Sequence, residues 1–103
     1  MEKVNYDMDY SAEYLHRLIC NKRCLIDLKD QGSYRAAETL LDVNILEERY
    51  LTHNQRTVIY YICERGYGVK KTAQLLGTNK DKIFEIMDSI LPTLQQQMVS
   101  DCV

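Results

Sequence analysis

The chain of 103 residues contains one proline, four glycines, no tryptophan and a single phenylalanine. An all-β fold needs frequent tight turns, which glycine and proline supply, so this composition argues against that class. Long apolar runs are also missing. No stretch approaches the roughly 18 apolar residues of a membrane-spanning helix, and the polar first ten residues have no apolar signal core. These absences predict a cytoplasmic protein with no membrane partner and with reduced cysteines.

Catalytic motifs are missing as well. The chain has no glycine-rich phosphate-binding loop, no G-x-S-x-G nucleophile elbow and no H-E-x-x-H metal-binding helix. Its two histidines, His16 and His53, have no evident set of carboxylate and nucleophile around them. The sequence therefore predicts that the protein is not an enzyme and needs no cofactor.

A weak metal-binding pattern remains to be weighed. His16, Cys20 and Cys24 are spaced four residues apart and would share one face of a helix, and zinc prefers such ligands. A straight helix spreads these three over about 12 Å, so further ligands such as His53 or Cys63 would have to come from elsewhere. We therefore expect no metal site, and instead small cysteines buried in a helix interface.

The residues that are present favour helices. Apolar residues make up 46% of the chain, which is enough for a core, and they recur at helical spacing. Asp9 or Ser11 can cap a first helix that runs to about Gln31. Ser33 follows a glycine and caps a second helix that runs to about Tyr50. The short connection predicts an antiparallel helical hairpin over residues 1–50.

The second of these helices has two apolar faces. One face comprises Ala37, Leu40, Leu41, Asn44 and Ile45, and the other comprises Val43, Leu46 and Tyr50. Two adjacent faces predict packing on two partners, namely the first helix and the C-terminal half of the chain.

Three helices are predicted between residues 51 and 91. Thr52 and Gln55 form a T-x-x-Q capping box for the first, which ends near Gly66. The second spans Val69 to Leu76. Gly77 ends that helix, and Thr78 or Asn79 caps a third from Lys80 to Leu91. The third helix carries an apolar stripe of Ile83, Ile86, Met87 and Ile90.

The only proline follows this third helix. Pro92 disfavours helical backbone at Leu91 and fits the first turn of a new helix, so a break or kink is predicted there. A short helix from Thr93 to Met98 would follow, with Leu94 and Met98 packing back on the core.

Residues 51–91 resemble the helix-turn-helix of sigma factor region four, which reads the upstream promoter element. That family opens with L-T-x-x-Q-R-x-V-I, here matched by Leu51, Thr52, Gln55, Arg56, Val58 and Ile59. Its glycine at the break and its A-x-L-L-G are matched by Gly66, Ala73, Leu75, Leu76 and Gly77. A cap and a β-branched residue of the recognition helix are matched by Asn79 and Ile83. Small transcription regulators of phages and mobile elements carry a similar C-terminal part behind a helical N-terminal segment.

The resemblance implies a set of DNA-binding residues. Its recognition helix places Lys80, Asp81, Lys82 and Glu85 toward the major groove. There the lysines could reach guanine or phosphate, and the carboxylates could accept from cytosine. It places Arg56, Lys70 and Lys71 near the DNA backbone, where N–H groups of Asn79 and Lys80 could also bind a phosphate. The alternative for these side chains is an ordinary solvated face of mixed charge.

The charge balance does not decide between these alternatives. Residues 1–50 contain seven Lys/Arg and ten Asp/Glu, whereas residues 51–103 contain six and five. The C-terminal half is thus only slightly positive, although a basic patch usually marks a nucleic-acid-binding protein.

The sequence therefore predicts an all-α protein of about five helices. Residues 1–50 would form a hairpin for interaction, with a possible homodimer through residues 9–50, and residues 51–103 would form the helix-turn-helix module with its tail. The predicted function is a small transcription regulator that binds double-stranded promoter DNA, RNA polymerase or another transcription regulator. The alternative is a protein-interaction module, such as an inhibitor of a regulator, that keeps the fold without binding DNA.

Overall fold

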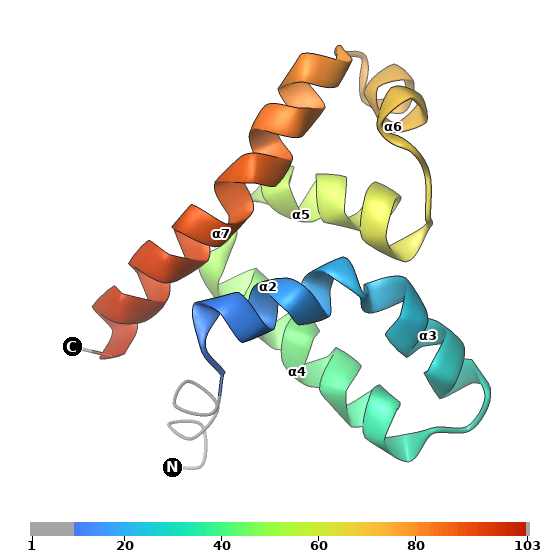
Figure 1. Ribbon diagram of the computed structural model, residues 1–103, viewed down its shortest axis with the longest axis vertical. Helices are drawn as coiled ribbons and strands as arrows, with labels where there is room; N and C mark the ends of the chain where they lie inside the picture. Colours follow the sequence, from blue (N-terminus) through green and yellow to red (C-terminus); the bar gives the residue numbers. More distant parts are fainter. Residues whose placement is uncertain (1–9, 103) are drawn as a thin grey trace.

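The computed structural model describes residues 10–102, and every element in that range is helical, which confirms the all-α prediction. The helices are α2 (Ala12–Cys20), α3 (Lys22–Asp30), α4 (Tyr34–Tyr50), α5 (His53–Ile59), α6 (Val69–Leu76) and α7 (Lys80–Cys102), and a π-helical segment (Tyr60–Glu64) continues α5. Figure 1 shows α7 as a long rod, and it contacts α2, α4, α5 and α6. None of these helices is long and apolar enough to cross a membrane.

The first predicted helix is interrupted at Asn21, so the prediction of one continuous helix to Gln31 is wrong. Ser11 caps α2 as expected, by accepting from the backbone N–H of Tyr14, whereas Asp9 lies outside the described residues. Asn21 leaves the helical region (φ −101°, ψ 19°), and its side-chain amide donates to the carbonyl of Arg17 at 3.0 Å. Asparagine competes in this way with helical hydrogen bonds, so a new helix begins at Lys22.

The hairpin partner α4 begins and ends as predicted. Gly32 turns the chain with φ +102°, and the Ser33 hydroxyl accepts from the N–H of Ala36. The prediction that both apolar faces of α4 are covered is wrong for one of them. Val43, Leu46 and Tyr50 are buried, but Leu41 and Ile45 are 60% and 42% exposed. Leu40, on the same predicted face, is buried, so this face is covered only in part.

The C-terminal half begins with the predicted capping box. The Thr52 hydroxyl accepts from the N–H of Gln55, and the Gln55 side chain accepts from the N–H of Thr52. After Ile59 the helix widens into the π-helical segment, where the N–H of Arg65 donates to the carbonyl of Tyr60. Gly66, with φ +76°, then ends it.

The predicted break at Leu91–Pro92 is absent, because α7 runs continuously from Lys80 to Cys102. Proline lacks the N–H that would donate to the carbonyl of Asp88, so α7 continues past this position with one hydrogen bond fewer. Beyond the proline, Leu94 and Met98 are buried as expected. Their burial holds the helix in register past the missing hydrogen bond.

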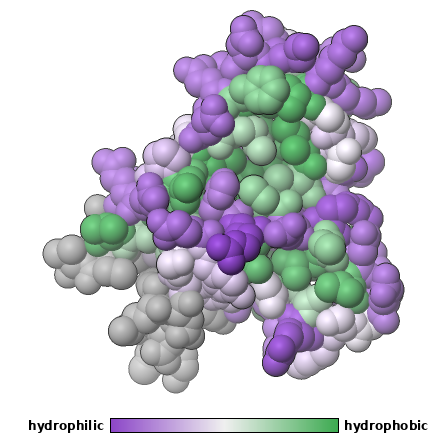
Figure 2. All heavy atoms as spheres, in the orientation of Figure 1, coloured by the Kyte–Doolittle hydropathy of each residue, from purple (hydrophilic) through white to green (hydrophobic). Residues whose placement is uncertain are grey.

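Two apolar clusters form the core. The larger cluster combines residues from α2, α4, α5 and the C-terminal part of α7, and includes Leu15, Val43, Ile59, Ile90 and Leu94. This cluster therefore contains residues from both sides of the predicted domain boundary at residue 50. The smaller cluster consists of Val58, Ala73 and Ile83, with Ile62, Val69, Ile86 and Met87 packed against it. Figure 2 shows apolar atoms gathered in two areas on this side of the molecule, separated by a polar band.

Candidate nucleic-acid interface

The connection between α6 and α7 is a three-residue turn with defined hydrogen bonds. Gly77 adopts φ +69°, which is a left-handed conformation that favours glycine. The N–H of Thr78 donates back to the carbonyl of Ala73 at 2.9 Å, and the N–H of Gly77 donates to Gln74. The side-chain oxygen of Asn79 accepts from the N–H of Lys82 at 2.9 Å, so Asn79 is the residue that caps α7. The turn therefore fixes where α7 begins.

The smaller apolar cluster fixes the angle between the two helices. Ala73 on α6 and Ile83 on α7 are both buried, together with Val58 on α5. Because Ile83 is fully enclosed, the opposite side of the first turns of α7 must face outward.

This outward side carries the predicted charged residues. Lys80, Asp81, Lys82 and Glu85 are all exposed, as expected from their spacing around the apolar stripe. The ammonium of Lys82 lies 3.5 Å from a carboxylate oxygen of Glu85. An exposed pair of this kind contributes only about 0–1 kcal/mol to stability, so a ligand can readily take over the lysine. The four residues have no net formal charge.

The start of α6 is more basic. Lys70 and Lys71 are exposed, and the ammonium of Lys71 lies 5.3 Å from the centre of the Tyr67 ring. The guanidinium of Arg65 lies 5.5 Å from the same ring and donates to the Tyr67 hydroxyl at 3.2 Å. Hydrogen bonds with the Tyr67 and Tyr60 hydroxyls raise the pKa of this guanidinium. Arg65 and Tyr67 were not among the predicted site residues, although a cation and an aromatic residue beside Gly66 were a usable signal.

Arg56 does not lie with the other predicted residues. Its side chain borders a cavity formed with α4, whose lining includes Asn44, Glu47 and Glu48. Its Nε atom is buried without a hydrogen-bond partner within the described chain. The structure thus turns Arg56 toward acidic residues of α4, which a sequence pattern in residues 51–59 alone does not reveal.

Exposed apolar side chains also accompany the charged face. Phe84 is 51% exposed, and Leu75 and Leu76 are exposed at the end of α6. Phe84 lies outside the stripe of Ile83, Ile86, Met87 and Ile90, so its exposure could have been predicted from helical spacing. Phenylalanine can contact the methyl group of thymine, and it can equally anchor a protein partner.

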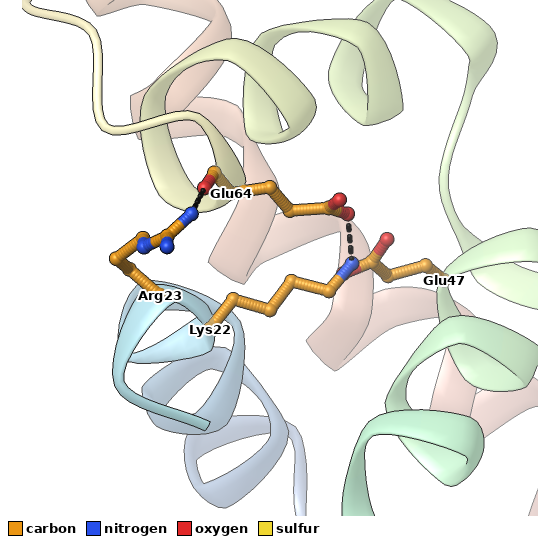
Figure 3. Close-up of polar contacts among 4 residues, drawn as sticks. All are labelled: Lys22, Arg23, Glu47 and Glu64. Atoms are coloured by element: carbon orange, nitrogen blue, oxygen red, sulfur yellow. Dashed lines mark hydrogen bonds and ion pairs between the residues drawn. The ribbon is translucent and has the colours of Figure 1, made fainter. Parts of the chain in front are cut away.

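A buried ion cluster lies away from this face, where α3, α4 and the π-helical segment meet. The side chain of Lys22 is only 1% exposed, and its ammonium lies 2.8 Å from carboxylate oxygens of both Glu47 and Glu64. Figure 3 shows Lys22 reaching between these carboxylates, while the neighbouring Arg23 donates to the carbonyl of Glu64 at 2.8 Å. The wider π-helical turn presents both the carboxylate and the carbonyl of Glu64 to α3.

Burial raises the pKa of the Glu47 carboxyl above its ordinary value, and the positive charge of Lys22 only partly opposes this shift. The negative charge of Glu64 adds to the increase, whereas Arg56 reduces it. The cluster therefore connects the hairpin to the C-terminal helices. This connection carries a desolvation penalty, because the Glu47 carboxylate is removed from water. The only sign of it in the sequence is a pair of charged residues, Lys22 and Arg23, that interrupts an apolar stripe.

The histidines and cysteines do not form a metal site within the part of the chain that the structure describes. The Cys20 sulfur lies 3.8 Å from Nε2 of His16, but Cys20 and Cys24 are exposed. The expectation that these cysteines are buried is wrong, because Ile19 and Lys22 occupy the inward positions on either side of Asn21. Cys63 is buried in the larger cluster, and burial raises the pKa of its thiol to about 11.

No protein-family model, curated protein or solved structure matches this chain. The functional inference therefore rests on the residues and geometry described above. The geometry provides a short helix, α6, that meets the long helix α7 at a fixed turn, together with an exposed, charged start of α7 and a basic start of α6.

Proposed function

We propose that the protein is a small transcription regulator that binds promoter DNA through a sigma-like helix-turn-helix formed by α5, α6 and α7. The observation that carries the proposal is the turn at Gly77–Asn79, which fixes α7 with Ile83 inward and Lys80 and Lys82 outward. A recognition helix needs this combination of a rigid support and a free polar face near its N-terminus.

The proposed interface has two parts. Lys80 and Lys82, with Asp81 and Glu85 between and after them, enter the major groove and contact base edges or phosphates. Lys70 and Lys71 on α6 bind phosphates and set the orientation of the module. Arg56 has no part in this interface, because its side chain faces α4.

A second candidate function is a protein-interaction module that docks on RNA polymerase or on another regulator. Two observations favour it: the outward face of α7 has no net formal charge, and Phe84 and Leu75 are exposed beside it. Aromatic anchors surrounded by polar residues are typical of protein interfaces.

A double charge reversal, Lys80→Glu with Lys82→Glu, distinguishes DNA binding from docking on a protein partner. Binding sites are first selected from a library of random DNA duplexes, and their affinity is measured by fluorescence anisotropy at several salt concentrations. For four or five phosphate contacts, the log–log slope of the wild type should be about −4. The double variant should lose about a hundredfold in affinity, because it removes two direct contacts.

The matched control is Arg17→Glu with Arg35→Glu, which changes net charge equally through two exposed residues of the hairpin. It should alter affinity far less than the α7 variant. If the α7 variant binds DNA as the wild type does, α7 is not the DNA-reading helix. Retention of RNA polymerase from a nuclease-treated lysate by both wild type and the α7 variant would then support the second candidate.

A further inference from the structure

An uncovered groove runs along α4, beside the buried ion cluster. Two adjoining cavities form it, with volumes of about 330 Å³ and about 420 Å³. The first is bordered by Ile26 and Lys29 of α3, and the second by Glu48 of α4 and Arg56 of α5. Leu41, Asn44 and Glu64 border both cavities, which makes the groove continuous. We call this surface, from Lys29 to Glu48, the α4 groove.

The side of the groove formed by α4 has a regular helical spacing and carries the exposed apolar side chain of Leu41. Ala37, Leu41, Asn44 and Glu48 follow one another at intervals of four, three and four residues, so they form one stripe along α4. Leu41 is the most exposed leucine among the described residues, and Ile45 extends the same stripe. This is the spacing by which one helix receives another.

The two ends of the α4 groove carry opposite charge. At one end, Lys29 and Ala37 border the same cavity. At the other end, the exposed Glu48 borders the second cavity together with Arg56. Neither the Lys29 ammonium nor the Glu48 carboxylate has a hydrogen bond or ion pair to another residue within the described range.

We propose that the α4 groove binds a second copy of this chain, with the two α4 helices packed antiparallel about a two-fold axis. An axis near the midpoint of the groove places Leu41 against Asn44 of the partner subunit and Ala37 against Glu48 of the partner subunit. Lys29 then meets Glu48 of the partner subunit, and symmetry repeats this ion pair. The groove is thus complementary to itself only in the antiparallel arrangement.

The opposite charges of the two ends select this occupant. A parallel arrangement would bring the two Glu48 side chains together, and like charges disfavour it. Tyr10, which precedes α2, does not border the groove. Its hydroxyl donates to Asp42 of α4 at 2.9 Å. With 17 residues, α4 is about 25 Å long, enough to form the centre of an interface of standard size.

The dimer goes beyond the proposed function and does not depend on it. It uses α3 and α4, whereas the proposed DNA contacts lie on α6 and α7. Its test is made on the protein alone, in the absence of nucleic acid, so that either hypothesis can fail without the other.

Sedimentation equilibrium of the full chain tests the proposal up to about 100 µM protein, the range of weak specific association. The wild type should be a dimer, and Leu41→Glu should be a monomer with unchanged helical circular dichroism. Val99→Glu, at an exposed apolar residue near the end of α7, is the matched control and should remain a dimer.

Charge reversal at Lys29 and Glu48 tests the proposed dimer without changing Leu41. Lys29→Glu and Glu48→Lys should each raise the dimer Kd about tenfold, because each disrupts two ion pairs. The double variant Lys29→Glu with Glu48→Lys should return to within about threefold of the wild type. A monomeric wild type, or a dimer that none of these changes weakens, would overturn the proposal.

Discussion

Two regions of the molecule use charged side chains in opposite ways. Where α3, α4 and the π-helical segment meet, Lys22 is enclosed and paired with Glu47 and Glu64 at 2.8 Å. At the junction of α6 and α7, Lys82 and its neighbours are exposed, and the Lys82–Glu85 separation is 3.5 Å. We refer to these regions as the buried ion cluster and the α6–α7 junction.

The two regions differ in whether water can solvate a charged side chain that has lost its ion-pair partner. At the α6–α7 junction, water solvates any charge that loses its partner, so the fold does not depend on these side chains and they are free to bind a ligand. In the buried ion cluster, a charge that loses its partner remains enclosed, which is strongly unfavourable. The same residue types therefore support the fold in one region and are available for function in the other.

The largest expected effect is that of Lys22→Met. The substitution removes the ammonium that pairs with both the Glu47 and the Glu64 carboxylates, so it should lower the free energy of unfolding by about 3–5 kcal/mol. Urea denaturation followed by circular dichroism measures the change. At the α6–α7 junction, Lys82→Met should change the free energy of unfolding by no more than about 0.5 kcal/mol.

A second substitution sharpens this result. Adding Glu47→Leu to Lys22→Met removes the more deeply buried carboxylate, and it should recover most of the lost stability, because an apolar replacement of a buried pair is often close to neutral. Similar stability of Lys22→Met and Lys82→Met would contradict the distinction between the two regions.

Local sequence signals predicted much of the fold. The caps at Ser33 and Thr52, the stop at Gly77 and the bounds of α6 follow from interactions within a few residues, and the structure agrees with them. The outward position of Lys80 and Lys82 likewise follows from helical spacing. These features are local, so the sequence contains the information needed to place them.

Features that depend on distant residues were missed. The burial of Lys22 requires Glu47 and Glu64, which lie far along the chain, and the break at Asn21 that turns Lys22 inward is a modest local signal. The continuity of α7 through Pro92 depends on the burial of Leu94 and Met98 against other helices. Tertiary packing overrides local preference at these positions, and it also places Arg56 against α4.

A smaller effect is expected from Gly77→Ala, which tests whether backbone geometry holds the α6–α7 junction together. An added Cβ would meet no atom within 4 Å, so the effect comes only from φ +69°. Placing alanine in the left-handed region should lower the free energy of unfolding by about 1–2 kcal/mol in urea denaturation.

The control is Gly68→Ala at the start of α6, where the added Cβ is equally free but φ is −77°. It should change stability by no more than about 0.5 kcal/mol, because reduced freedom of the unfolded chain offsets a weaker cap. Equal effects of the two substitutions would show that the conformation of Gly77 does not hold the junction.

The smallest expected effect is a dependence on pH that arises in the buried ion cluster and not at the α6–α7 junction. Because the pKa of the Glu47 carboxyl is raised on folding, the folded protein binds more protons than the unfolded chain between the ordinary carboxyl pKa and the raised value. The contribution of Glu47 to stability therefore falls as pH increases through this interval. Urea midpoints of the wild type and Glu47→Gln, measured across this range, isolate that contribution, since all other carboxyls are common to both proteins. The wild type should lose stability relative to Glu47→Gln as pH rises, whereas Glu85→Gln, at the exposed pair, should run parallel to the wild type. A wild type that instead gains stability over Glu47→Gln with rising pH would mean that the attraction of Lys22 outweighs the burial of Glu47.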